Sequence, residues 1–284
     1  MGAPPFVTRF APSPTGLAHR GHAFSALTAF EAARTAEGRF LLRIEDIDAA
    51  RCRPQFEAAF LDDLAWLGVT WESPVRRQSE HMADYHAALA RLIDRGVVYR
   101  CFKTRKESLD DIARAPHGPV AARAGGPLAP EQERALVDQG RPFAWRLSIA
   151  AARRALGGFD TLTFAEDGAG PLGERGTIAF DPQSAQDVIV ARKDLGVSYH
   201  LAVVVDDALQ GVTHVIRGQD LFAAAHPQRL LQALLDLPVP IYRHHRLLLR
   251  PDGKRFAKRD TAETLRGLRE GGLGAAALRA ELGF

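Results

Sequence analysis

The N-terminal third of the chain alternates between short β-type segments and amphipathic helical segments, and this alternation restricts the possible folds more than any other feature. The predicted elements follow in the order strand, helix, strand, helix, helix: residues 6–10, 21–37, 40–44, 54–67 and 79–95. Phe24, Leu27 and Phe30 recur at helical spacing, and Gly38 suits the C-terminal cap of that helix. This order predicts an α/β fold, with a parallel sheet whose faces are covered by helices.

The middle of the chain has a different pattern. Residues 115–130 are rich in Ala, Gly and Pro and indicate a loop, whereas residues 141–182 indicate short strands and turns. The α/β pattern returns at Asp187. We therefore predict a discontinuous α/β domain, a small inserted α+β subdomain and a short helical C-terminal segment: residues 1–100 with 187–260, residues 101–186, and residues 261–284.

Composition excludes several classes of protein. A hydrophobic share of 46% over 284 residues is enough for a sizeable core and argues against a disordered chain. The net charge of +3 permits an RNA partner without predicting one. Cys52 and Cys101 are the two cysteines, too few for a disulfide framework, so we expect the reducing cytoplasm. We find no signal peptide and no run of about 18 apolar residues, and expect no membrane partner.

A turn containing Pro and Gly separates the first predicted strand from the first predicted helix, and it carries two histidines. The segment from Pro12 to His22 places Gly16, His19 and Gly21 near the N-terminus of that helix. Unpaired N–H groups and the helix dipole favour a phosphate at such a terminus, and histidines can donate to phosphoryl oxygens. Taken alone, the segment is equally compatible with a turn that has a capping histidine.

A second candidate is the basic loop at residues 251–259, which contains Lys258. A Gly-flanked basic loop is usually a solvated turn. Its functional interpretation is a mobile arm whose lysine stabilises the charge that develops on a transferring phosphoryl group.

Together these two segments resemble the HIGH and KMSKS signatures of class I aminoacyl-tRNA synthetases. HIGH stands here as HRGH at residues 19–22, and a degenerate KMSKS stands as RFAKR at residues 255–259, with Arg255 and Ala257 replacing the first Lys and the Ser. Further segments resemble glutamyl-tRNA synthetases in the same order: residues 9–16, 43–48, 199–207, 213–220 and 244–249. The resemblance covers about residues 6–259. It implies a Rossmann-type nucleotide-binding catalytic domain with an acceptor-type insertion.

The resemblance also implies a set of site residues. Arg9 and Arg217 would bind a substrate carboxylate, Glu45 would bind the α-ammonium group, and Ser13 and Tyr199 would complete the glutamate pocket. The residue types agree, because arginine binds carboxylates bidentately and a carboxylate pairs with an ammonium group. ATP would be bound by the following residues, of which the two histidines and the lysine would be catalytic: Pro12, Gly16, His19, Gly21, His22 and Lys258.

Each of these residues also has a simpler interpretation when it is taken alone. Glu45 follows a predicted strand and is compatible with an ordinary surface ion pair there, and Arg217 is compatible with a charge at a sheet edge. Asp206 and Asp207 are interpreted as capping a turn or orienting a neighbour, and not as metal ligands.

Only 26 residues follow Lys258, so we expect no anticodon-binding domain. In this respect the chain resembles the glutamyl-queuosine tRNA(Asp) synthetases, stand-alone relatives of the glutamyl-tRNA synthetase catalytic core. That resemblance implies a ligase that activates glutamate without tRNA and transfers it to queuosine in the anticodon of tRNA(Asp). Val203 stands where ordinary glutamyl enzymes carry an asparagine, and losing that hydrogen bond should weaken amino-acid binding by about 1 kcal/mol.

The implied ligands are L-glutamate, ATP with Mg²⁺, and tRNA(Asp) carrying queuosine, and we expect a monomer. Many members of the resembled family bind zinc through Cys-x-Cys and Tyr-x-x-x-Cys. Here Cys101 is followed by Lys103 and by no later cysteine, and His117 is the one other candidate ligand. Since zinc usually needs four ligands, we predict no metal site.

Three alternatives stay open. The first is a minimal glutamyl-tRNA synthetase that charges a tRNA 3′ end. The second is a non-catalytic synthetase paralogue, which the degenerate loop at residues 255–259 favours. The third is a nucleotidyltransferase of the same fold that acts on a small molecule.

Overall fold

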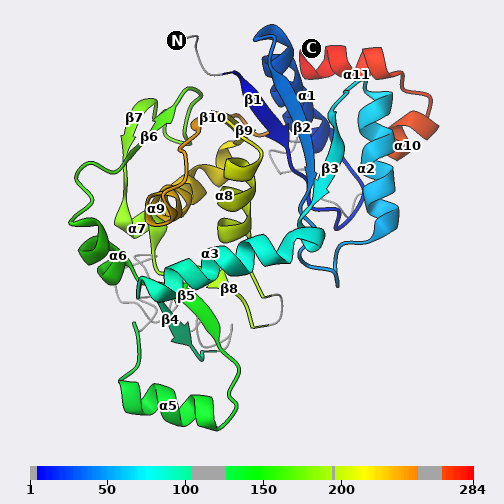
Figure 1. Ribbon diagram of the computed structural model, residues 1–284. Helices are drawn as coiled ribbons and strands as arrows, with labels where there is room; N and C mark the ends of the chain where they lie inside the picture. Colours follow the sequence, from blue (N-terminus) through cyan, green and yellow to red (C-terminus); the bar gives the residue numbers. More distant parts are fainter. Residues whose placement is uncertain (1–4, 104–125, 194–195, 249–263) are drawn as a thin grey trace.

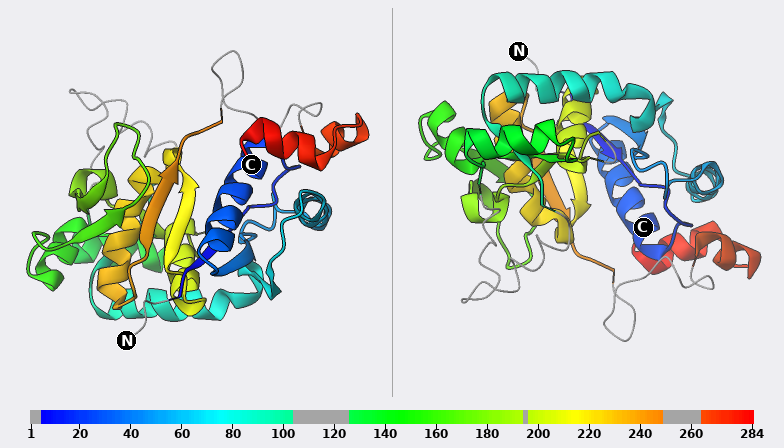
Figure 2. Two further views of the ribbon diagram at one scale, coloured as in Figure 1. Left: turned by 90° about the horizontal axis from the view of Figure 1, so that it is seen from above. Right: turned by 90° about the horizontal axis from the view of Figure 1, so that it is seen from below.

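The computed structural model describes residues 5–103, 126–193, 196–248 and 264–284. Two groups of parallel strands lie side by side at its centre (Figure 1 and Figure 2). The first group is parallel throughout and has the order β1-β2-β3: β1 (Val7–Phe10), β2 (Arg39–Ile44) and β3 (Glu72–Arg77). The second has the order β7-β6-β10-β9: β7 (Gly176–Ala179), β6 (Thr163–Glu166), β10 (Ile241–His245) and β9 (His214–Gly218). In the second group β10 pairs parallel with both β9 and β6, and only β7 is antiparallel.

The two groups meet between β1 and β9. The Val7 N–H donates to Thr213 Oγ1 at 2.8 Å, and the Thr213 N–H donates to Val7 O at 2.9 Å. Phe10 and Gly218, at the carboxyl ends of these strands, line one cavity. In open α/β sheets, ligands bind outside the carboxyl ends of strands at the point where the chain connections diverge. The fold therefore places a binding site at the end of β1 and β9.

Helices connect these strands and cover their faces (Figure 1). In the first half, α1 (Arg20–Thr35) links β1 to β2 and α2 (Pro54–Trp66) links β2 to β3. The second half and its connections contain these elements: η1 (Gln78–His81), α3 (Met82–Asp94), α8 (Tyr199–Leu209), η2 (Gln219–Ala224) and α9 (Ala225–Leu235). Leu92, Leu201 and Leu230 are fully buried in one apolar cluster, so α3, α8 and α9 share a core.

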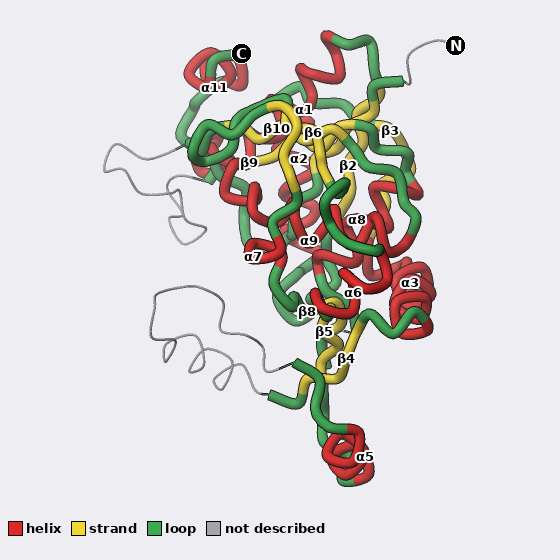
Figure 3. The backbone as a smooth tube through the Cα atoms, turned by 90° about the vertical axis from the view of Figure 1, so that its left-hand side faces the viewer, coloured by secondary structure: helices red, strands yellow, loops and turns green. Residues whose placement is uncertain are grey.

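A third sheet lies at one end of the molecule, and its pairing is antiparallel. It consists of β4 (Val98–Cys101), β5 (Ala144–Leu147) and β8 (Ile189–Ala191). Three helices fall between these strands in the sequence: α5 (Pro130–Asp138), α6 (Ile149–Leu156) and α7 (Pro182–Ala185). Figure 3 shows that α5 projects away from the rest of the protein beyond β4 and β5.

The C-terminal helices α10 (Leu265–Glu270) and α11 (Ala275–Leu282) pack beside α1 and α2 (Figure 1). Leu278 is fully buried in the same apolar cluster as Leu27 and Phe60. Arg279 donates to Leu67 O at 3.0 Å, and the Leu265 N–H donates to Ala18 O at 2.9 Å. The segment is therefore attached both to the helix layer and to the turn that precedes α1. None of the described helices is long and apolar enough to span a membrane.

The predicted α/β fold with a parallel sheet is confirmed, and the first five predicted elements lie within a few residues of their observed bounds. The predicted division into domains stays a prediction. The hydrogen-bonded sheets do not follow its boundary at residue 186, because β6 falls inside the predicted insertion yet pairs with β10.

Gly38 has a different role from the predicted one. The residue with the left-handed backbone after α1 is Glu37, at φ 49°, and the Gly38 N–H then donates to Ala33 O at 2.8 Å. A Cβ on Gly38 would lie 2.3 Å from Phe6 O, so glycine is needed here for the close approach of β1 and not for its backbone angle.

Candidate active site

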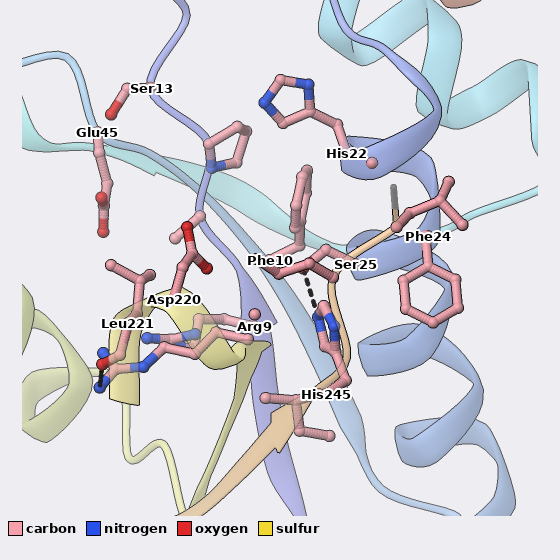
Figure 4. Close-up of a pocket in the computed structure, with 18 of the residues that line it drawn as sticks. Arg9, Phe10, Ser13, His22, Phe24, Ser25, Glu45, Asp220, Leu221 and His245 are labelled. Atoms are coloured by element: carbon pink, nitrogen blue, oxygen red, sulfur yellow. Dashed lines mark hydrogen bonds between the residues drawn. The ribbon is translucent and has the colours of Figure 1, made fainter. Parts of the chain in front are cut away.

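A cavity of about 690 Å³ opens at the carboxyl ends of β1 and β9. Its wall contains most of the residues predicted from the sequence: Arg9, Pro12, Ser13, His19, Gly21, His22, Glu45, Tyr199 and Arg217. Figure 4 shows two sides to it, with Ser13, Glu45 and Arg9 on one and His22 and Phe24 on the other. The first side carries charged groups, and the second is the N-terminal end of α1.

His19 and His22 form a reciprocal cap at the start of α1. His19 Nδ1 accepts from the Gly21 N–H at 3.1 Å, while the His19 N–H donates to His22 Nδ1 at 3.2 Å. Both Nδ1 atoms act as acceptors, so the proton of each neutral ring lies on Nε2. A Cβ on Gly21 would lie 3.0 Å from the His19 ring, which explains the glycine between the histidines. The capping interpretation is correct, and it is compatible with phosphate binding because both rings line the cavity.

Asp207, at the end of α8, orients Arg9. Its carboxylate accepts from Arg9 Nε at 2.9 Å and from Arg9 Nη2 at 3.3 Å, and Arg43 Nη1 lies 2.8 Å away. Burial alone would raise the pKa of Asp207, but Arg9 and Arg43 outweigh it and hold that pKa below its usual value. The bidentate contact uses Nε and Nη2 of Arg9 and does not involve its Nη1.

Asp206 is fully buried and contacts side chains behind the cavity. It accepts from Arg76 Nε at 2.7 Å, from Gln78 Nε2 at 2.8 Å and from the Tyr85 hydroxyl at 2.9 Å. Both aspartates therefore orient neighbouring side chains, and neither caps a turn.

Glu45 follows β2 and faces the cavity with 9% of its side chain exposed. Its nearest cation is Arg43, whose Nη2 lies 3.5 Å from Glu45 Oε1. Burial raises the pKa of Glu45 to about 7, and Arg43 and Arg9 oppose this shift only in part. A carboxylate that is buried and incompletely paired can gain a strong interaction from a cationic ligand.

Arg217 lies in β9 and is 5% exposed. Its Nη1 donates to Gln228 Oε1 at 2.8 Å and to the Tyr199 hydroxyl at 3.4 Å, and its Nη2 donates to Leu221 O at 3.0 Å. Among the described residues no carboxylate lies within 4 Å of its guanidinium, in contrast to Arg9. Within the described ranges, its charge is thus directed at the cavity without an acidic partner.

A second cavity of about 480 Å³ adjoins the first, because Ser13, Glu45 and Tyr199 line both. Three arginines contribute to its wall: Arg51, Arg146 and Arg192. The two cavities thus share the residues between them, and the second adds cationic groups on the side of β8.

Several predicted residues lie elsewhere. Gly16 does not line the cavity, and Lys258 lies outside the described residues. Val203 is 1% exposed within the apolar cluster of α8, so its effect on ligand binding stays a prediction. In the described part of the chain no group of three or more His, Cys, Asp or Glu side chains could hold a metal ion. Because His117 lies outside that part, the absence of zinc also stays a prediction.

The sequence reasoning missed other residues of the wall. Ser25 in α1 and His245 in β10 approach each other, with 3.1 Å between Ser25 Oγ and His245 Nε2 (Figure 4). Asp220 and Leu221, directly after β9, also line the cavity. Asp220 and His245 lie within the motifs recognised at residues 213–220 and 244–249, but no role followed from the pattern alone, and Ser25 and Leu221 lie outside both motifs.

Comparisons with known proteins agree with the fold. Residues 5–272 match the family of class I tRNA synthetases (E and Q), catalytic domain. The chain is 48% identical to glutamyl-Q tRNA(Asp) synthetase of Rhodobacter capsulatus, over 98% of this chain and 100% of that protein. It is 43% identical to the protein of the same name from Symbiobacterium thermophilum, over 93% and 81%. A crystal structure of glutamate-tRNA synthetase from Elizabethkingia anophelis superposes with a TM-score of 0.71 at 25% identity, over 95% of this chain and 54% of that one.

Proposed function

Because the chain belongs to the class I tRNA synthetase (E and Q) catalytic-domain family and is a ligase of that type, we propose that it activates glutamate with ATP, without tRNA, and transfers it to queuosine in the anticodon of tRNA(Asp). The observation that carries this proposal is that one cavity contains an incompletely paired carboxylate, Glu45, and an arginine, Arg217, that has no acidic partner among the residues that the structure describes. A ligand with an ammonium group and a carboxylate would complement both.

The amino-acid side of the cavity suits glutamate. Glu45 would bind the α-ammonium group, and Arg9 and Arg217 would bind carboxylate oxygens, with Ser13 and Tyr199 between them. Two arginines match the two carboxylates of glutamate better than they match a neutral amino acid. Relatives that are 48% and 43% identical to this chain carry the name glutamyl-Q tRNA(Asp) synthetase, which supports glutamate as the amino acid.

The helix side suits the nucleotide. The N-terminus of α1 and the rings of His19 and His22 would bind the phosphates. The turn between β1 and α1, which contains Pro12, would lie beside these phosphates. The α-carboxylate of glutamate attacks the α-phosphorus of ATP, and pyrophosphate leaves. Lys258 would stabilise the charge on pyrophosphate, and Mg²⁺ would arrive with ATP.

The second cavity supports transfer to RNA. This cavity reaches Glu45 and Tyr199 from the side away from α1. Arg51 and Arg192 in its wall suit the anionic phosphate backbone of RNA. A hydroxyl of the queuosine ring would attack the carbonyl carbon of the adenylate, and AMP would leave. The protein would contribute position and charge and no covalent nucleophile. We expect it to act as a cytoplasmic monomer.

Activation should depend on the ionisation of Glu45. Its carboxylate binds the substrate ammonium group only when ionised, and its pKa is raised to about 7. The kcat/KM for glutamate should therefore level off above about pH 8 and fall about tenfold per pH unit below about pH 6. ATP–pyrophosphate exchange measured from pH 5.5 to 8.5 tests this. Glu45→Gln is the matched control and should be weakly active at every pH. A Glu45→Gln enzyme with the wild-type profile would assign the titration to another group.

The acceptor is tested with labelled glutamate and two preparations of tRNA(Asp), one with queuosine and one with guanosine at that position. We expect label on the queuosine form alone, and equal label when its 3′-terminal adenosine is removed. Label on both forms that disappears with the terminal adenosine would indicate a minimal synthetase that charges the 3′ end. No label and no pyrophosphate exchange would indicate a non-catalytic paralogue.

A further inference from the structure

We propose that Glu166 and His244 form a buried pair whose role is to position Arg217 for the carboxylate of the substrate. This inference rests on the proposed function, in which Arg217 binds glutamate. The three residues stand on neighbouring strands, with Arg217 in β9, His244 in β10 and Glu166 in β6. His244 is the direct cross-strand partner of Arg217, and β6 lies on the other side of β10.

Glu166 is fixed by three donors. Its Oε1 accepts the backbone N–H of His244 and that of Gly168, each at 2.8 Å, and its Oε2 lies 2.5 Å from His244 Nδ1. The side chains of Glu166 and His244 are both fully buried. A Cβ on Gly168 would lie 2.2 Å from His244 O and 2.8 Å from Glu166 Oε1. The local backbone is therefore built to let Glu166 reach His244.

The two hydrogen-bond partners of the His244 ring determine its tautomer. Glu166 holds the proton on Nδ1, so Nε2 carries the lone pair and accepts from Arg217 Nε at 3.0 Å. A doubly protonated ring would direct an N–H at the Arg217 N–H. Burial lowers the pKa of His244, which keeps the ring neutral despite its acidic neighbour. Burial would raise the pKa of Glu166, but the hydrogen bonds from His244 and Gly168 hold it below its usual value and keep Glu166 ionised.

The pair orients Arg217 without neutralising it. A carboxylate of the protein in direct contact with Arg217 would occupy the N–H groups that the substrate carboxylate needs. Asp207 occupies such a pair of N–H groups on Arg9. A neutral imidazole accepts one hydrogen bond from Nε and leaves the positive charge in place. Of the five guanidinium N–H groups, four then have partners in the described part of the chain: His244, Gln228, Tyr199 and Leu221. The fifth N–H group, which is on Nη2, can therefore bind a ligand. The N–H group on Nη1 that makes the long contact with Tyr199 can do so as well.

Two substitutions of His244 separate positioning from mere burial. His244→Gln carries an amide near the place of Nε2 and can still accept from Arg217. His244→Asn carries its amide near the place of Nδ1, so it can contact Glu166 but cannot reach Arg217. We expect the KM for glutamate to rise about tenfold to a hundredfold in His244→Asn and in Glu166→Gln, and less than about threefold in His244→Gln. The KM for ATP should change little in all three.

The measurements are ATP–pyrophosphate exchange, the midpoint of thermal unfolding, and ¹⁵N NMR of histidine-labelled protein. His226→Asn is the control, because His226 is buried nearby and contacts the Asp181 N–H instead of Arg217. The NMR signal of His244 in the wild type should show the Nδ1–H tautomer. This result is expected whether or not the protein activates glutamate, so it tests the pair independently of the proposed function. An equal KM for glutamate in His244→Asn and His244→Gln, or an Nε2–H tautomer, would overturn the inference.

Discussion

Replacing Arg217 by alanine should lower kcat/KM for glutamate by about a hundredfold to a thousandfold, because the substrate carboxylate would lose its buried cationic partner. The effect should appear mainly in the KM for glutamate, and the KM for ATP should change only a few-fold, since the phosphates would bind at the start of α1. The same variant leaves acceptors on His244, Gln228 and Leu221 without a donor, so its unfolding midpoint should also fall.

Arg243→Ala is the matched control for this prediction. Arg243 lies on the neighbouring strand β10, and its side chain is 47% exposed and 3.8 Å from Asp167. Exposed ion pairs of this kind contribute about 1 kcal/mol or less. Arg243→Ala should therefore keep wild-type exchange kinetics. If Arg217→Ala raised the KM for ATP as much as the KM for glutamate, Arg217 would not be specific to the amino acid.

The predicted site residues that line the cavity share a structural position. Arg9, Glu45 and Arg217 all stand at or just after the carboxyl end of a parallel strand, and Tyr199 begins α8. An alternation of strand and helix predicts that such ends meet at one edge of a sheet. Long motifs at these ends could therefore be assigned to one site before the fold was known.

The parts that were missed depend on non-local pairing of short segments. Glu166 ends a strand of four residues and contacts His244, which lies 78 positions later. A segment of that length has no periodicity that assigns it to a particular sheet. It was therefore predicted to belong to the insertion, and the pair that holds Arg217 could not be foreseen.

The acidic pair Asp206-Asp207 shows a second limit. The sequence places both residues near the end of an apolar segment and permits either a capping role or a role in orienting a neighbour. The structure shows the second role, because the last turn of α8 places the two carboxylates against Arg9, Arg43 and Arg76. Which cation a buried carboxylate meets is decided by helix packing and not by the local sequence.

Asp207→Asn should be the most destabilising of the changes considered, by about 3–5 kcal/mol. It removes the charge that compensates two arginines whose side chains are 5% and 0% exposed, Arg9 and Arg43. Chemical denaturation monitored by circular dichroism measures the loss. Since the pKa of Asp207 is held below its usual value, its stabilising effect is complete above that value and is lost only as the pH falls through the lowered pKa. The titration of Asp207 itself therefore contributes equally to the difference from wild type at pH 5.5 and at pH 7.5.

Asp236→Asn is the counterpart on the surface. Asp236 also faces two arginines, Arg91 at 3.8 Å and Arg95 at 3.5 Å, but its side chain is 77% exposed. Its left-handed backbone, at φ 54°, suits asparagine, so the change in stability should be below about 0.5 kcal/mol. Asp207 also raises the pKa of Glu45, so the folded fraction of Asp207→Asn should retain exchange activity at a lower pH than the wild type does. An equally small loss of stability in both variants would contradict this prediction and would mean that Glu45 and Asp206 suffice to compensate Arg9 and Arg43.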